Sequence, residues 1–205
     1  MVPLGLPLGG VVGVHPALLD GVLDDQRGKR AAVGLRVERG GEVTYHGPGQ
    51  LVAYPILRLG DRGLLVRPLV TALEEAMIAT CAELGVRTYR RDGHPGCWVG
   101  GEVGGEGGQG EGRPPRKIGA LGLRIERGVS YHGIALNVDP DLRDFELIDP
   151  CGEPGLISTS IAEELGRTAE PPTTAAVERA GAIFAAAFAR ALGAPLARLA
   201  PVSVS

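Results

Sequence analysis

Lysine is almost absent from this chain of 205 residues. Arginine and lysine together number 21, but lysine occurs only as Lys29 and Lys117. Codon usage can explain such a bias, yet it leaves few side chains able to exchange a proton near neutral pH, since arginine stays protonated and lysine need not. The formal net charge of −3 gives no bulk excess of positive charge, so the composition does not indicate a nucleic-acid partner.

Cysteine and long apolar runs are also scarce. The three cysteines, Cys81, Cys97 and Cys151, have no pairable spacing, which argues against a disulfide framework and for a reducing compartment. Prolines and glycines interrupt the first twenty residues, and no basic start precedes them, so they fit neither a signal peptide nor a membrane-spanning helix. We therefore expect a cytoplasmic protein without membrane association.

The expected domain organisation follows from changes in composition and apolar periodicity along the sequence. Residues 1–32 show neither a strand nor a helix period, so we expect an irregular N-terminal segment there. We expect a folded domain over 33–193 and a C-terminal tail over 194–205. Within the domain, residues 100–115 contain eight glycines and two prolines and are expected to form a flexible loop, because such a segment buries too little apolar surface to offset its ordering entropy.

The apolar spacing predicts an α+β (α/β two-layer) domain, in which a mixed or antiparallel sheet is packed with helices. Strands cluster between the helices without regular alternation. Helices are expected at 64–84, 159–165 and 174–192, the last after a threonine cap. Strands are expected at 34–37, 43–46, 51–57, 86–89, 97–99, 117–126, 129–138 and 145–148.

Two segments repeat one pattern, because residues 39–47 and 127–133 both end in Tyr-His-Gly after a hydroxyl residue. On a strand, Thr44 and His46 would share one face and Tyr45 would point to the other. Each copy alone could be a strand end with satisfied polar side chains. Two copies beside glycines, which allow close approach of a ligand, favour a pocket wall.

Lys117 enters an apolar, glycine-rich strand. A buried ammonium is costly unless it is paired or functional, so this position is a candidate for catalysis. The alternative is a snorkelling lysine whose head lies in water.

Cys151 lies in an Asp-Pro-Cys-Gly turn that could hold its thiol outward. A lone cysteine that only packs is the alternative. Cys81, on the apolar face of a helix, and Cys97, beside Trp98, are interpreted as packing residues. Two histidines and a cysteine could bind a metal, but paired-cysteine and His-Glu-x-x-His patterns are missing, so no metal is expected.

Four segments together resemble the lipoyl(octanoyl) transferase family. They are Arg-Gly-Gly-x-x-Thr-Tyr-His-Gly-Pro-Gly-Gln (39–50), Lys-Ile-Gly-Ala-Leu-Gly (117–122), Ser-Tyr-His-Gly-Ile-Ala-Leu-Asn (130–137) and Pro-Cys-Gly (150–152). The resemblance covers residues 33–192. It implies the fold of biotin and lipoate protein ligases and an ATP-independent acyltransferase with no cofactor.

The resemblance also implies the site residues. Cys151 would form an acyl-thioester intermediate, with Lys117 as its catalytic partner. The implied acyl-substrate residues are Arg39, Gly40, Gly41, Glu42, Val43, Thr44, Tyr45, His46, Ala120, Leu121, Gly122, Gly133, Ile134 and Ala135.

The chain departs from the family pattern in two places. The family has a longer N-terminal portion with a Glu-His-Pro segment and a Gly-Arg-Arg turn, which residues 1–32 lack. The glycine-rich stretch at 100–115 stands where the family has a short turn.

The implied reaction is octanoyl transfer from octanoyl-acyl carrier protein to the lysine of lipoyl domains, in 2-oxoacid dehydrogenases and the glycine cleavage H protein, as the first step of protein lipoylation. Acyl carrier proteins are acidic, so a basic rim formed by Arg87, Arg90, Arg91, Arg113 and Arg116 could steer them. Two alternatives stay open. One is a shortened, inactive paralogue that binds acyl groups or lipoyl domains, and the other is an ATP-dependent lipoate or biotin protein ligase.

Overall fold

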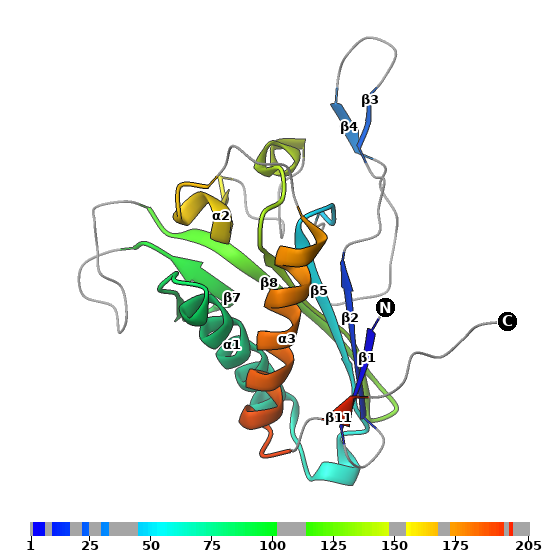
Figure 1. Ribbon diagram of the computed structural model, residues 1–205. Helices are drawn as coiled ribbons and strands as arrows, with labels where there is room; N and C mark the ends of the chain where they lie inside the picture. Colours follow the sequence, from blue (N-terminus) through cyan, green and yellow to red (C-terminus); the bar gives the residue numbers. More distant parts are fainter. Residues whose placement is uncertain are drawn as a thin grey trace, which may run out of the picture.

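The computed structural model describes residues 2–6, 10–16, 22–24, 30–32, 45–101, 114–147, 155–167, 173–194 and 197–198. In these residues one large sheet lies beside two long helices (Figure 1). The strands are β1 (Val2–Leu6), β2 (Gly10–Pro16), β5 (Gln50–Ile56), β6 (Tyr89–Arg91), β7 (His94–Val99), β8 (Arg116–Glu126), β9 (Val129–Asn137), β10 (Ile157–Ser158) and β11 (Ala197–Arg198). A separate two-stranded ribbon is formed by β3 (Val22–Asp24) and β4 (Arg30–Ala32).

The large sheet is mixed. Its strands follow the order β11-β1-β2-β5-β9-β8-β7-β6, all paired antiparallel, while β10 joins β8 in parallel. The longest antiparallel ladder joins β8 to β9 through Arg127 and Gly128, whose φ values of 49° and 77° match a two-residue hairpin turn. The α+β class predicted from the sequence is therefore confirmed.

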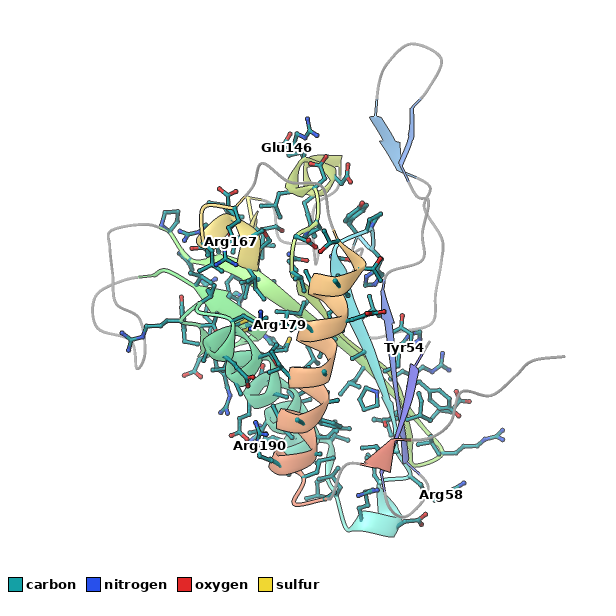
Figure 2. The ribbon with its side chains drawn as sticks, in the orientation of Figure 1. Tyr54, Arg58, Glu146, Arg167, Arg179 and Arg190 are labelled. Carbon is teal, nitrogen blue, oxygen red and sulfur yellow. The ribbon has the colours of Figure 1, made fainter. Side chains whose placement is uncertain are left out.

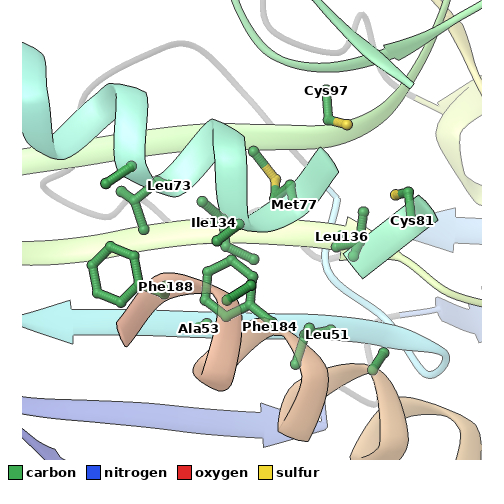
Figure 3. Close-up of a cluster of buried hydrophobic side chains, with 14 of the residues drawn as sticks. Leu51, Ala53, Leu73, Met77, Cys81, Cys97, Ile134, Leu136, Phe184 and Phe188 are labelled. Atoms are coloured by element: carbon green, nitrogen blue, oxygen red, sulfur yellow. The ribbon is translucent and has the colours of Figure 1, made fainter. Parts of the chain in front are cut away.

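Two helices cover one face of the sheet, α1 (Val66–Glu83) and α3 (Thr174–Ala191). Their apolar residues recur every three or four positions and meet Leu51, Ala53, Ile134 and Leu136 of β5 and β9 in a single core (Figure 3). Phe184 and Phe188 of α3 stack in this core with ring centroids 6.0 Å apart. None of the described helices is both long and apolar enough to cross a bilayer.

The helix ends agree with the sequence. The Thr173 hydroxyl accepts a hydrogen bond from the Ala176 amide at 3.2 Å, so the predicted threonine cap of α3 is confirmed. Helix α1 stops before Gly85, whose φ of 95° suits glycine after a helix C-terminus. The third predicted helix is short, α2 (Ile161–Glu164), capped by Ser160. Two 3-10 turns complete the described elements, η1 (Gly60–Arg62) and η2 (Leu142–Leu147).

The expectation that residues 1–32 are irregular was wrong for the part that the structure describes. Strand β1 pairs with β2, and β2 pairs with β5 from Val11↔Ile56 to Pro16↔Leu51. Strand pairing is made by backbone groups of distant segments, so an added strand needs no apolar alternation of its own. Glycines and prolines in these strands concealed them.

Three predicted strands were also wrong in most of their described residues. Of the strand predicted at 86–89, only Tyr89 belongs to a strand, the start of β6. Residues 145–147 belong to η2, where the Asp141 carboxylate accepts a hydrogen bond from the Arg143 amide at 3.1 Å and favours a local turn over an extended strand. Tyr45 and His46 precede β5 without regular structure. Strand 34–37, residues 43–44 and 148, and residues 102–113 of the predicted flexible loop lie outside the described residues.

Gly133 marks a close approach between β9 and β5. A Cβ placed there would overlap the Ala53 carbonyl oxygen and lie 2.6 Å from Pro55 Cδ. Both neighbours belong to the sheet backbone or its proline ring and cannot turn aside. We expect Gly133→Ala to lower the free energy of unfolding by about 1–3 kcal/mol, as overpacking does. Urea denaturation followed by circular dichroism measures this.

Gly60→Ala is the matched control for that substitution. A Cβ at Gly60 meets nothing within 4 Å, so its effect should stay within about 0.5 kcal/mol. Equal stabilities of the two variants would contradict the close approach at Gly133.

Candidate active site

The face of the sheet opposite α1 and α3 carries part of the predicted site. Side chains alternate between faces along a strand. On β9, Ile134 and Leu136 enter the helix-covered core, so Ala135 and Asn137 face the other way. We call this second side the open face.

The two predicted substrate segments of the sheet lie directly opposite one another. Ala120, Leu121 and Gly122 of β8 pair with Ala135, Ile134 and Gly133 of β9. Alternation places Ala120, Gly122 and Ala135 on the open face, whereas the space beside Gly133 is filled by Ala53 and Pro55 of the β5 region. Leu121 and Ile134 instead pack toward the helices, so only their backbones border the open face.

Lys117 lies at the start of β8. Its register partner is Trp98 of β7, and its Nζ lies 5.0 Å from the centroid of the Trp98 ring. Lys117 is only 8% exposed and Trp98 only 1%, which excludes the alternative of a lysine snorkelling into water. The cation–π contact partly compensates the ammonium for lost hydration.

Gly96 makes room for this lysine. Its φ is 129°, and a Cβ there would lie 3.1 Å from Lys117 Cε. The Gly96 amide donates to the Glu74 carboxylate of α1 at 2.9 Å, which anchors β7 at this point. The Lys117 side chain therefore contacts β7, which Glu74 of α1 anchors at Gly96.

Tyr45 ties the predicted substrate segment to η2. Its hydroxyl donates to the Asp144 carboxylate at 2.6 Å, and its ring lies edge-on to Phe145 with centroids 5.2 Å apart. A Cβ at Gly47 would overlap the Tyr45 hydroxyl, so the glycine of the Tyr-His-Gly segment is needed for this packing. In Figure 2, Glu146 marks the end of the molecule where η2 lies, and Arg58 marks the opposite end.

The two Tyr-His-Gly histidines lie apart along the sheet. His46 Nδ1 is 3.2 Å from Gln50 Oε1, whereas the His132 ring contacts Tyr54 with centroids 5.5 Å apart. Gln50 and Tyr54 are four residues apart on β5, about 13 Å along a strand. The repeated motif therefore marks two places along the sheet, and His46 lies at the end where β8 carries Lys117.

Sequence reasoning missed a set of buried polar residues at this same end. Gln50, Asn137 and Thr159 are 1%, 6% and 1% exposed and are joined by hydrogen bonds to each other or to backbone groups. Gln50 and Asn137 are the last residues of two of the quoted sequence segments. An amide side chain at the end of an apolar strand was the sequence signal that could have identified them. Thr159 offered no such signal.

The match to known families decides the assignment. The model of the lipoyl protein ligase A/B catalytic domain matches residues 17–184, which is most of the chain. This chain belongs to that family. The resemblance drawn from the four sequence segments is confirmed.

Curated relatives of the family are octanoyltransferases. That of Cellvibrio japonicus is 42% identical over 159 residues, covering 78% of this chain and 65% of the relative. That of Aromatoleum aromaticum is 51% identical over 122 residues, covering 60% of this chain and 47% of the relative. The chain thus spans about half to two thirds of the length of these relatives.

Solved structures of similar shape are a bipartite lipoate protein ligase from Thermoplasma acidophilum and a biotin protein ligase from Aquifex aeolicus. The first is 12% identical with a TM-score of 0.49, covering 76% of this chain and 56% of that one. The second is 12% identical with a TM-score of 0.44, covering 71% and 53%.

Among the site residues implied by the family resemblance, Cys151 and the segment 39–44 lie outside the described residues. Cys81 and Cys97 are both buried with no exposed surface. A hydrogen bond with Cys97, together with burial, raises the pKa of the Cys81 thiol well above its usual value. The raised pKa keeps the Cys81 thiol protonated, and burial shields the Cys97 thiol from reagents, which agrees with the assignment of both residues to packing.

Metal and charge features of the described part are simple. No group of three or more metal-ligating side chains occurs in the residues that the structure places. Of the predicted basic rim, Arg116 forms a two-pronged ion pair with Glu164 of α2, and Arg90 pairs with Glu75 at 2.7 Å. Arg91 lies over the Trp98 ring, with Cζ 5.0 Å from its centroid. Arg87 is exposed, and Arg113 lies outside the described residues.

Proposed function

We propose that the chain transfers an octanoyl group from octanoyl-acyl carrier protein to a lysine of lipoyl domains, through a thioester on Cys151. The acceptors are lipoyl domains of 2-oxoacid dehydrogenases and the glycine cleavage H protein, and the reaction takes place in the cytoplasm without ATP or a cofactor. Membership of the lipoyl protein ligase A/B family and the octanoyltransferase relatives support this proposal.

The observation that carries the proposal is the burial of Lys117 at the start of β8, the strand that also carries Ala120 and Gly122. With 8% exposure, this lysine holds its amine largely shielded from water and beside the segment implied to bind the acyl substrate. Such burial is costly for structure alone and is typical of lysines that act in catalysis. The Pro-Cys-Gly turn that would supply the nucleophile follows β9 and η2 in the sequence.

The first step is acylation of the cysteine. An ordinary thiol with a pKa of about 8.5 is only about 3% thiolate at pH 7. An ammonium beside a thiol favours the thiolate, and we assign this role toward Cys151 to Lys117. The thiolate attacks the carbonyl carbon of the acyl-carrier thioester, the carrier thiol leaves, and the octanoyl group stays on Cys151 Sγ.

The second step transfers the group to the acceptor. A neutral lipoyl-domain lysine attacks the Cys151 thioester, the carbon–sulfur bond breaks and an amide forms. After the first step the Lys117 ammonium gives one proton to the departing carrier thiolate, so that the carrier leaves as a thiol and Lys117 is neutral. Neutral Lys117 then accepts the proton that the attacking amine loses, and the Cys151 thiolate and the Lys117 ammonium are restored. The acyl group arrives activated as a thioester, so no nucleotide is consumed.

Mass spectrometry tests the proposal. The intact chain is incubated with octanoyl-carrier protein alone, and then with a lipoyl domain and no ATP. We expect a hydroxylamine-labile octanoyl adduct in the first reaction and an octanoylated lipoyl domain in the second. An adduct without transfer indicates an acyl-binding paralogue. Octanoylation that occurs only with free octanoate and ATP indicates a ligase.

A further inference from the structure

A continuous series of buried hydrogen bonds runs from His46 to the strand that carries Lys117. His46 Nδ1 lies 3.2 Å from Gln50 Oε1, and Gln50 Nε2 donates to Asn137 Oδ1 at 2.8 Å. Asn137 Nδ2 donates to the Thr159 carbonyl at 2.8 Å. The Thr159 amide then donates to the Lys117 carbonyl at 2.9 Å, which extends the pairing of β10 with β8.

The backbone determines which way each amide of this series points. The Thr159 carbonyl can only accept, so Asn137 presents its NH2 group to Thr159 and its oxygen to Gln50. Gln50 must then present its own NH2 group to that oxygen. The Gln50 oxygen is left on the side of His46.

The opposite end of the series agrees independently. The Gly47 amide, which can only donate, reaches the same Gln50 Oε1 at 3.2 Å. An oxygen accepts from the imidazole only if that nitrogen carries a hydrogen. His46 Nδ1 is therefore the protonated nitrogen, and in the neutral ring the lone pair lies on Nε2.

We infer that Gln50 and Asn137 are positioning residues that hold the neutral His46 ring as its Nδ1–H tautomer and tie it to the strand of Lys117. Removing the Gln50 or the Asn137 side-chain amide would leave a buried polar group without a hydrogen-bond partner. Because an unpaired buried polar group costs free energy, the fully paired arrangement is the preferred one.

The catalytic part of this inference rests on the proposed function. His46 belongs to the segment implied to bind the acyl substrate, and the attacking amine carries N–H groups. A histidine nitrogen in that pocket can accept a hydrogen bond from the amine only when it bears the lone pair. When Nε2 is fixed as the nitrogen that bears the lone pair, the neutral His46 ring no longer adopts the alternative tautomer.

Long-range ¹H–¹⁵N correlation spectra test the tautomer directly. The spectra are recorded at about pH 8.5, two units above the ordinary histidine pKa of about 6.5. His46→Asn identifies the His46 signals among the four histidines. We expect the Nδ1 shift of a protonated nitrogen and the Nε2 shift of an unprotonated one. An Nε2–H ring in the parent protein would overturn the inference, and this measurement decides it without any variant.

Gln50→Met tests the role of the series. This variant keeps the side-chain length and loses both hydrogen-bonding groups. We expect the Nδ1–H preference to be lost and kcat to fall by about 10- to 100-fold, as when partners that orient a functional histidine are removed. KM for the carrier protein should not change, because Gln50 is only 1% exposed and cannot touch a docked protein.

Thr80→Val is the matched control. Thr80 is fully buried in α1, and its hydroxyl donates to the Ala76 carbonyl at 2.6 Å, so this variant also loses a buried polar group. We expect an unchanged His46 tautomer and unchanged kcat. A Gln50→Met variant that keeps the Nδ1–H ring contradicts the inference. Absence of acyl transfer in the parent protein refutes the proposed function, whereas the tautomer is read from the ring itself.

Discussion

Replacing Cys151 by alanine is expected to abolish the octanoyl adduct and to reduce transfer to lipoyl domains by at least about 10³-fold. Loss of a covalent nucleophile removes the route that divides one difficult step into two easier ones, and such losses are the largest that single substitutions cause in enzymes. Intact-protein mass spectrometry measures the adduct. A gel-shift or mass assay of the lipoyl domain measures the transfer.

The other two cysteines provide the control for that experiment. Cys81 and Cys97 are fully buried, and hydrogen bonding with Cys97 together with burial raises the pKa of the Cys81 thiol. Iodoacetamide should therefore modify the native chain at Cys151 alone. Cys97→Ala should still form the adduct, although it loses some stability. An adduct that survives in Cys151→Ala would place the nucleophile elsewhere.

Replacing Lys117 is expected to have the second-largest effect, and two variants separate its two proposed roles. Lys117→Arg keeps a positive charge but cannot accept a proton at neutral pH. We expect it to form the adduct and to transfer the group about 10²- to 10⁴-fold more slowly, the usual cost of losing a general base. Single-turnover kinetics separate the acylation step from the transfer step.

Lys117→Met removes the charge as well. Without the ammonium, less of Cys151 is thiolate at a given pH, so the pH profile of alkylation at Cys151 should move to higher pH. In Lys117→Arg the same profile should stay close to that of the parent. Both variants must be compared by circular dichroism, because the side chain contacts Trp98. Normal transfer by Lys117→Arg would show that Lys117 does not act as a base.

Local patterns predicted the helices well. In α1 and α3 the apolar residues that recur every three or four positions are those that fill the core. Thr173 and Gly85 stand at their expected cap positions. Helix formation depends on neighbours within a few residues, so the sequence carries its signal locally. The hairpin turn at Arg127 and Gly128 is local in the same sense.

Long-range pairing was the part that local patterns did not predict. Strands β1 and β2 are joined to β5 by backbone hydrogen bonds to distant residues, and η2 replaced a predicted strand because Asp141 makes a local turn. Strand propensity depends on what lies beside the strand, which no window of neighbouring residues contains.

By itself, the sequence determined the family, the α+β class and the choice of Lys117 as a candidate, since these depend on residue types and their order. Only the tertiary structure decided that Lys117 is buried against Trp98, that His46 and His132 lie apart, and that Gln50, Asn137 and Thr159 link His46 to the Lys117 strand. These features arise where β5, β8, β9 and β10 meet. Burial and hydrogen-bond direction depend on the contacts between these strands, and those contacts form only when the distant segments fold together.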